Sequence, residues 1–371
     1  MNILYFFPEK ETIMCRWQRT HFIGELAYNN CLIEIFNPLF YENIEEANEK
    51  LLEKIRLSNV DLFFTNLCNE KWIFIDTLCE IKKRGVPTLS YRGDNLAMPF
   101  NDKILGKYFD LVWLTAKDTE YLYKKWKVNT VFAPYAANPY TYKYYRDSDL
   151  IRKCCFIGTP YGSRSIMINQ LTSNSLNVDV FYGGQPSNIS TQKINSTFEV
   201  LFHDDKKIMM DRLRYREGRK IIKGSVLNRI VGKRAIEESP YLERFQSVPP
   251  EDTSKFYSKY CLSIASTSTN STDVLRNPLK IINLRNFEIP MSGGIEICKY
   301  NAELAEYFED GKEIILYQNN EELIDKVRYF TQKASDAEIR RIKEAARKRA
   351  ENDHTWMNRF KVSFDKLGLK Y

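Results

Sequence analysis

Short segments that are apolar on both faces alternate with helical segments along this chain, and this alternation constrains the fold more than any other feature. In the first half, strands are predicted at residues 2–7, 31–36, 60–66, 86–92, 110–115 and 130–135. Helices are predicted at 17–29, 42–57, 71–84 and 117–126. Strands without a polar face must be covered on both sides, which is typical of a parallel sheet between two layers of helices.

The same pattern restarts in the second half. Residues 136–150 are polar and aromatic without a clear period, and we interpret them as a linker. Strands are then predicted at 154–159, 178–184, 261–266, 294–299 and 313–317, before a long helical run from residue 320. A length of 371 residues is enough for two domains. The sequence therefore predicts an α/β protein with two Rossmann-like domains, whose parallel sheets face each other across a cleft that binds the ligand.

Basic residues are concentrated in the second half. Of the net charge of +7, residues 1–150 contribute 19 Lys/Arg and 20 Asp/Glu, whereas residues 151–371 contribute 36 and 28. Such an excess suits phosphates, a nucleic acid or an anionic membrane, and a solvated basic surface is an equal alternative.

The most basic segment is residues 212–234, RLRYREGRKIIKGSVLNRIVGKR, in which cations interleave with apolar residues. This pattern suits peripheral contact with an anionic membrane, or with a lipid-linked phosphate acceptor. A helical insertion whose apolar residues pack on the second domain is the alternative.

Cysteine and histidine usage argues against a metal site. The eight cysteines form no Cys-x-x-Cys pair, and the chain has three histidines. Scattered cysteines favour a reducing cytoplasm, with a peripheral position at the inner face of the membrane as an open possibility. We expect no signal peptide, because the opening MNILYFFPEK turns acidic and polar early, and no membrane span, because no stretch of about 18 apolar residues occurs.

Several enzyme classes lack their motifs. No Gly-x-Gly-x-x-Gly follows the first strand, and neither a Walker sequence nor Gly-x-Ser-x-Gly occurs. These absences argue against dehydrogenases, P-loop NTPases and α/β-hydrolases.

Two segments of the second half suit a nucleotide. FIGTPYGSR (156–164) has the form strand, turn, helix, and such a turn offers backbone N–H groups and a cation to a phosphate. LRNFEIPMSGG (284–294) places Arg285 one turn before Glu288. Glu288 could accept hydrogen bonds from a ribose diol, and Arg285 could neutralise a diphosphate. An ordinary turn and a surface ion pair are the alternatives.

The order and spacing of longer stretches resemble a known family. They include WQRTHFIGEL (17–26), VPTLSYRGDN (86–95), CFIGTPYGSR (155–164), LRNFEIPMSGG (284–294), LAEYFEDGKEIILYQNNEELIDKVRYF (304–330) and DHTWMNRF (353–360). With them the chain resembles the CgeB-like, or spore-maturation-protein-like, glycosyltransferases of the GT-B superfamily over nearly its whole length. The resemblance implies three regions: an N-terminal acceptor-side domain (1–140), a C-terminal nucleotide-sugar-binding domain (150–352) and a helix that crosses back to the first domain (353–371).

The resemblance also implies site residues. Glu288 occupies the second position of a glutamate pair found in many GT-B enzymes, where it meets the ribose, but Lys280 occupies the first and Glu296 lies in the next strand. The predicted donor residues are Gly158, Tyr161, Arg164, Tyr182, Gly183, Val248, Arg285, Glu288, Ser292, Gly293 and Gly294. Arg16, Arg19 and Asn138 are predicted on the acceptor side. His21 is the predicted catalytic base, supported by Asp94.

The predicted function is hexosyl-type glycosyl transfer without a metal or cofactor. The co-substrate would be a UDP- or other NDP-sugar, and the acceptor a hydroxyl of a cell-surface glycan or lipid-linked precursor; no nucleic acid is expected as partner. Arginines and helix-start N–H groups would stabilise the leaving diphosphate in place of a metal. The alternatives are a nucleotide-sugar 2-epimerase of the same architecture and a non-catalytic glycan- or nucleic-acid-binding module.

Overall fold

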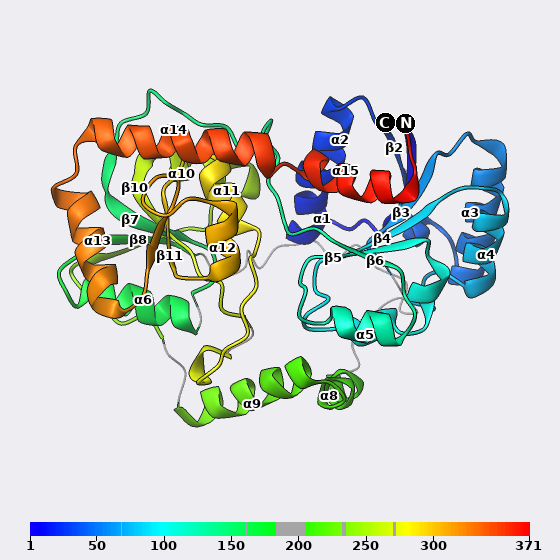
Figure 1. Cartoon of the computed structure of the whole chain (residues 1–371), viewed down its shortest axis with the longest axis horizontal. Helices are drawn as coiled ribbons and strands as arrows, with labels where there is room; N and C mark the ends of the chain where they lie inside the picture. The colour runs from blue at the N-terminus through cyan, green and yellow to red at the C-terminus, as the bar shows by residue number, and fades with distance from the viewer. Residues whose placement is uncertain (68, 161, 183–204, 232–234, 270–271) are drawn as a thin grey trace. The chain divides into compact units, whose positions relative to one another are not determined.

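The computed structural model divides the chain into two compact units. It describes residues 1–371 except 68, 161, 183–204, 232–234 and 270–271. The first unit comprises Met1–Pro134, Asn188–Ile222 and Trp356–Tyr371, and the second comprises Tyr135–Ser187 and Lys223–Thr355. Each unit is built on its own six-stranded sheet (Figure 1).

The sheet of the first unit is entirely parallel, in the order β2-β1-β3-β4-β5-β6. Its strands are β1 (Asn2–Phe6), β2 (Leu32–Phe36), β3 (Leu62–Thr65), β4 (Thr88–Arg92), β5 (Leu111–Leu114) and β6 (Thr130–Phe132). The helices are α1 (Ile13–Gln18), the π-helix η1 (Arg19–Ile23), α2 (Gly24–Tyr28), α3 (Ile44–Leu57), α4 (Ile75–Lys83), α5 (Glu120–Lys125) and α15 (Trp356–Leu367). Three short 3-10 helices, η2 (Pro38–Phe40), η3 (Pro99–Asp102) and η4 (Leu105–Tyr108), complete it.

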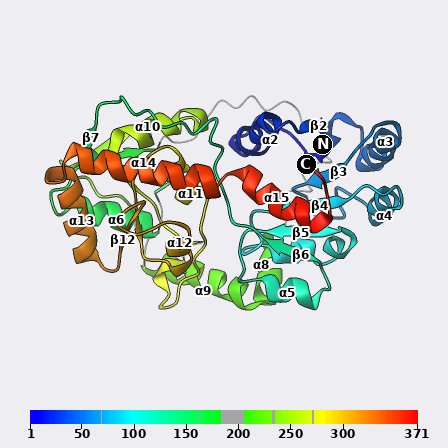
Figure 2. The ribbon, with the colours of Figure 1, turned by 45° about the horizontal axis from the view of Figure 1, so that its top comes forward.

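Both faces of this sheet are buried, as the apolar strands predict. On one face Phe6 and Phe63 pack in a core with Leu51 of α3 and Leu78 of α4. On the other face, an aromatic cluster joins the sheet to α15 and to the segment before α2; it includes Phe22, Phe64, Trp113, Trp356 and Phe360. Figures 1 and 2 show α3 and α4 together, with α15 over a different part of the sheet.

The second unit repeats the architecture, in the order β12-β11-β10-β7-β8-β9 with all neighbours parallel. Its strands are β7 (Ile151–Ile157), β8 (Val178–Phe181), β9 (Leu242–Phe245), β10 (Tyr260–Ile264), β11 (Glu296–Lys299) and β12 (Ile315–Tyr317). Its helices are α6 (Ser163–Thr172), α10 (Thr253–Lys259), α11 (Arg285–Met291), α12 (Ala302–Tyr307), α13 (Asn320–Gln332) and α14 (Asp336–Asp353), with the 3-10 helices η5 (Pro250–Asp252) and η6 (Thr272–Val274).

The basic segment 212–234 begins at the end of helix α8 (Asp205–Leu213) and continues through helix α9 (Arg216–Val231); its last three residues lie outside the described residues. Helix α8 and the first turns of α9, up to Ile222, belong to the first unit. Tyr215 at the corner between them is buried, and its hydroxyl donates to the carbonyl of Ala97 at 2.7 Å. Among the helices of the described residues, none has the length and apolar character needed to cross a membrane.

Candidate functional site

Arg285 lies over the carboxyl end of β7 in the second unit. A Cβ added to Gly158 would come within 2.4 Å of the Arg285 Nη2, and Gly158 has a φ of +122°. The guanidinium carbon lies 5.4 Å from the centre of the Phe156 ring. The Arg285 Nε is buried and has no hydrogen-bond partner among the described residues. Glycine is thus needed here to make room for the cation, at the sheet edge where ligands of parallel sheets bind.

The start of α11 is fixed by a chain of asparagine hydrogen bonds. The Asn283 Oδ1 accepts from the backbone N–H of Arg285 at 3.1 Å, and its Nδ2 donates to the carbonyl of Ser266 at 2.7 Å. Asn286 in turn donates to the Glu296 Oε1 at 2.6 Å. Sequence reasoning missed both asparagines, although Asn283 stands where helix-capping residues are common.

Glu296 is the last residue in this series of hydrogen bonds, and it is buried. It begins β11 and is completely inaccessible to solvent. Burial raises the pKa of its carboxyl to about 7. The structure confirms that Glu296 lies in the strand after the two glycines, and its carboxyl supports the loop before α11 through Asn286.

Glu288 is held by a tyrosine rather than by Arg285. The Glu288 Oε1 accepts from the Tyr142 hydroxyl at 2.7 Å, whereas no ion pair joins Glu288 to Arg285 among the described residues. Burial, and next the neighbouring Glu288 carboxylate, raise the pKa of Tyr142. Arg347 of α14 donates to the carbonyls of Tyr142 and Met291, and so fastens the tyrosine segment to α11.

The Ser-Gly-Gly after α11 has a packing role. Ser292 is buried, and its hydroxyl donates to the carbonyl of Glu288 at 2.7 Å. Gly293 has a φ of +65°, and a Cβ there would lie 2.3 Å from the Tyr144 ring. A Cβ at Gly294 would lie 2.9 Å from the Ile289 side chain. These contacts explain both glycines without a ligand, and a donor role for Ser292, Gly293 and Gly294 stays a prediction.

The predicted phosphate turn lies beside Ser266, which follows strand β10. Gly162 precedes α6 with a φ of +58°, and the Ser163 hydroxyl lies 3.1 Å from that of Ser266. Arg164 donates to the carbonyl of Thr159 at 3.2 Å. The N-terminus of α6 and residues around Ser266 thus share one region of the second unit.

The remaining predicted donor residues are dispersed. Tyr182 follows β8 and is half exposed, with its backbone N–H bonded to the carbonyl of Phe245 at 3.1 Å. Val248 is partly buried against a cluster that contains Phe181 and Tyr257. Tyr161 and Gly183 lie outside the described residues.

His21, the predicted base, is fully buried in the first unit. It lies in η1, and its Nδ1 accepts from the Trp356 Nε1 at 2.7 Å. π-Helical turns are frequent at functional sites. Asp94 is exposed, and no hydrogen bond joins it to His21 among the described residues. The structure therefore does not bring these two predicted partners together.

Glu25 is a second buried polar residue beside the start of α15, which sequence reasoning missed. Its carboxylate accepts from the backbone N–H of Trp356 at 3.1 Å and of Met357 at 2.6 Å. A carboxylate at this position satisfies amides that the helix leaves unpaired.

The predicted acceptor-side residues are divided between the units. Arg16 and Arg19 are exposed on the first unit, and Arg19 forms an ion pair with Glu9. Asn138 belongs to the second unit, where it is buried and accepts from the backbone N–H of Tyr140 at 2.8 Å. Within the described part of the chain, no three or more His, Cys, Asp or Glu side chains gather as a metal would require.

Comparison with known proteins points to one class of enzyme. Residues 206–363 match a family described as "Glycosyl transferase-like". No curated protein matches the chain.

Solved structures resemble the chain over nearly its full length. Sucrose-phosphate synthase from Thermosynechococcus elongatus has 12% identity and a TM-score of 0.55, with 99% of this chain and 98% of that one covered. The Anabaena protein HepE in complex with UDP-glucose has 10% identity and a TM-score of 0.54, and both chains are covered completely. An alpha-glucosyltransferase in complex with UDP-glucose and DNA containing an abasic site has 11% identity and a TM-score of 0.59, with 98% of each chain covered.

These likenesses confirm the GT-B fold predicted from the sequence. Together, the fold and the family match over residues 206–363 indicate a glycosyltransferase. The narrower CgeB-like assignment, and the functional roles of regions 1–140, 150–352 and 353–371, stay predictions.

Proposed function

We propose that the protein transfers a sugar from a nucleoside diphosphate sugar to a hydroxyl acceptor, with a UDP-sugar as the first donor to test. The observation that carries the proposal is the placement of Arg285 over Gly158 with Glu288 one turn further along α11. Two of the structural neighbours are complexes with UDP-glucose, which supports this choice of donor.

The donor diphosphate would lie at the carboxyl end of β7. Arg285 presents its guanidinium there, and Gly158 has no side chain to keep phosphate oxygens away. The N-terminus of α6, a helix of 10 residues, adds backbone N–H groups that favour an anion. Charge grows on the leaving diphosphate as the glycosidic bond breaks, so a fixed cation at this point stabilises the transition state more than the ground state.

Glu288 would orient the nucleoside. A carboxylate has about four lone-pair sites, so it can accept hydrogen bonds from the two ribose hydroxyls in addition to the one from the Tyr142 hydroxyl. Tyr142 is a positioning residue in this arrangement: it holds the carboxylate in one orientation, while Arg347 holds the backbone of Tyr142.

His21 is proposed as the base that takes the proton of the acceptor hydroxyl, whereas Asp94 forms no hydrogen bond with it among the described residues. In the structure the His21 Nδ1 accepts from the Trp356 indole, so this nitrogen can accept a proton only after that hydrogen bond is released. Arg16 and Arg19, which are exposed on the first unit, are proposed to bind the acceptor.

The acceptor we propose is a cell-surface glycan or a lipid-linked precursor. The basic helices support contact with an anionic membrane, because several apolar side chains on them are exposed: Met209, Met210, Leu213, Val226 and Ile230. Ile221, by contrast, is buried. Packing therefore explains this apolar residue but not the exposed ones. Binding to anionic vesicles at low salt, lost on substitution of Arg214 and Arg219 by Gln, is the expected result.

The function is tested by incubating the protein with several nucleotide sugars and measuring free nucleoside diphosphate. A glycosyltransferase releases it faster when an acceptor extract is added. Release that is independent of acceptor would favour the epimerase, and binding without release would favour a non-catalytic module.

A further inference from the structure

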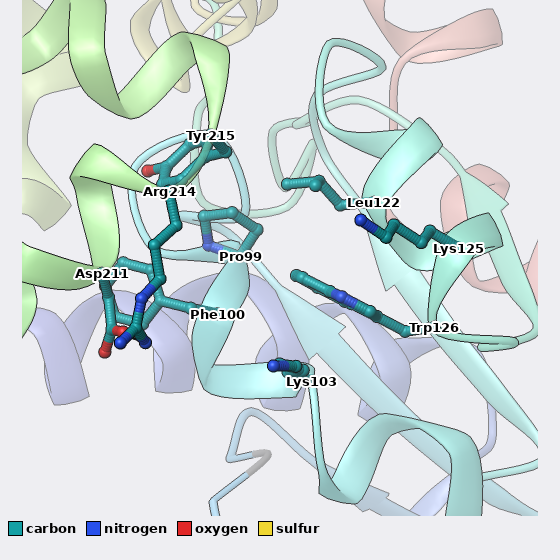
Figure 3. Close-up of a pocket in the computed structure, with 9 residues that line it drawn as sticks. All are labelled: Pro99, Phe100, Lys103, Leu122, Lys125, Trp126, Asp211, Arg214 and Tyr215. Atoms are coloured by element: carbon teal, nitrogen blue, oxygen red, sulfur yellow. Dashed lines mark hydrogen bonds and ion pairs between the residues drawn. The ribbon is translucent and has the colours of Figure 1, made fainter.

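A hollow of about 150 Å³ opens on the first unit, and none of its lining residues belongs to the proposed donor site (Figure 3). Three segments that are distant in sequence form its walls. The lining residues are Pro99, Phe100 and Lys103; Leu122, Lys125 and Trp126; and Asp211, Arg214 and Tyr215.

The corner between α8 and α9 is anchored firmly enough to form a wall. Tyr215 is 4% exposed and donates to the carbonyl of Ala97, and its ring lies 6.4 Å from that of Phe100. Glu217, which is 1% exposed, accepts from the Tyr121 hydroxyl at 2.9 Å and from the Arg216 Nε at 2.6 Å. These contacts join the basic helices to η3 and α5.

A second hollow of about 370 Å³ adjoins the first. It shares Leu122, Lys125, Arg214 and Tyr215 with it and adds Tyr121, Arg216 and Arg219. We call the two hollows together the basic groove. The larger one lies within the range of roughly 300–1,000 Å³ that is usual for small-molecule sites.

The charges of the basic groove are unbalanced. Its lining includes five cations, Lys103, Lys125, Arg214, Arg216 and Arg219, and one acid, Asp211, which pairs with Arg214. Neither Lys103 nor Lys125 forms an ion pair or side-chain hydrogen bond with any residue that the structure describes. In Figure 3 the two lysines come from different segments on the same side of the hollow as Trp126, and Arg214 comes from the opposite wall.

The floor of the basic groove is apolar and aromatic. Phe100, Leu122 and Trp126 contribute to it, and the Arg216 guanidinium lies 5.7 Å from the centre of the Tyr121 ring. Aromatic rings can cover the apolar face of a sugar, while Lys and Arg bind phosphate oxygens. A ligand that carries both a sugar and a phosphate satisfies both kinds of surface.

We propose that the basic groove binds a phosphate group of the acceptor, so that the acceptor is a phosphate-bearing sugar rather than a neutral glycan. This inference rests on the proposed function, which places the donor on the second unit and leaves the first for the acceptor. The phosphate can belong to a soluble phosphosugar or to the lipid carrier of a glycolipid; both present the same chemistry to the cations.

The test compares two double variants of the whole protein. K103Q/K125Q removes the two lysines without ion pairs from the basic groove. The matched control, K107Q/K124Q, removes exposed lysines at nearby positions of η4 and α5 that do not line it. The probes are glucose 1-phosphate, glucose, and phosphatidylcholine vesicles with and without a polyprenyl phosphate, all with the donor site saturated by UDP.

Glucose 1-phosphate or the polyprenyl phosphate vesicles should bind the wild-type protein and the control, and bind K103Q/K125Q roughly tenfold to thirtyfold more weakly. If K103Q/K125Q binds both probes more weakly, the phosphate alone is the ligand. If it binds only the polyprenyl phosphate vesicles more weakly, the acceptor is lipid-linked. Equal binding to both double variants, or glucose bound as tightly as glucose 1-phosphate, overturns the inference. Titration with UDP alone reports separately on the proposed function, since neither lysine belongs to the donor site.

Discussion

At the scale of single residues, Gly158 shows how the backbone makes room for Arg285. Gly158→Ala would place a methyl group 2.4 Å from the Arg285 Nη2, so we expect the guanidinium to move and donor affinity to fall. Calorimetric titration with UDP measures the affinity, and chemical denaturation measures the stability of the same variant.

Gly311→Ala is the matched control for this prediction. Gly311 also has a positive φ, of +79°, but a Cβ there has no atom within 4 Å. Both variants carry backbone strain, of order 1–3 kcal/mol. Equal donor affinity in the two variants would show that Arg285 does not depend on the glycine.

Glu296 makes a prediction about pH. Burial raises the pKa of its carboxyl to about 7, whereas in the unfolded chain the pKa is about 4.3. The folded protein therefore holds a proton that the unfolded chain releases between these values. The stability that this proton contributes is complete below about pH 4, and is lost as the pH rises through about 7.

Glu296→Gln should remove this dependence while keeping an acceptor for Asn286. Unfolding free energies measured by denaturant at a series of pH values should show the wild type losing up to about 3 kcal/mol relative to the variant between pH 4 and 7. Curves that run parallel over this range would contradict a buried, protonated Glu296.

At the scale of elements, α15 depends on a carboxylate from outside the helix. Glu25 accepts from the backbone N–H groups of Trp356 and Met357, and it is 1% exposed. Glu25→Ala would leave both amides unpaired, so we expect a loss of about 1–3 kcal/mol in the free energy of unfolding.

Denaturant unfolding of Glu25→Ala, with Glu45→Ala as a control on the exposed first turn of α3, measures this effect. Glu25→Gln keeps one oxygen acceptor and should lose less than the alanine variant. An alanine variant as stable as the wild type would show that α15 does not need this cap.

Most of the strands could be predicted from the sequence. Eleven strands were predictable from their largely apolar residues, as in β1, where residues 3–6 are at most 1% exposed. Strand β9 was missed because it lies at the sheet edge with Glu243, Arg244 and Phe245 exposed, so it has no apolar pattern.

The candidate site was predictable in part. Arg285 and Gly158 come from the two segments that were predicted to suit a nucleotide, and the folded chain places them together at the carboxyl end of β7. The partners Tyr142 and Asn286 were not predictable, because they are distant in sequence or carry no motif, and only the folded chain brings them to Glu288 and Glu296. The two glycines after α11 suggested a ligand, but packing against Tyr144 and Ile289 accounts for them.

At the scale of the whole molecule, we expect catalysis without a metal. Arg285 and the N-terminus of α6 are proposed to stabilise the leaving diphosphate, which is the role that a divalent cation plays in other transferases. Turnover of the donor should therefore be unchanged by a chelator such as EDTA. Loss of turnover in EDTA that manganese or magnesium restores would contradict this mechanism.

The central claim is that the second unit binds a nucleotide sugar through Glu288 and Arg285, and calorimetric titration of UDP-glucose into wild type and Glu288→Ala tests it most directly. The loss of a charged hydrogen-bond acceptor costs roughly 1.5–3 kcal/mol, so the affinity of the variant should fall about tenfold to hundredfold. Glu321→Ala, which changes an exposed glutamate of α13, should bind as the wild type does. A folded Glu288→Ala with unchanged affinity, or a wild type that binds neither UDP-glucose nor any other nucleotide sugar, would contradict the account.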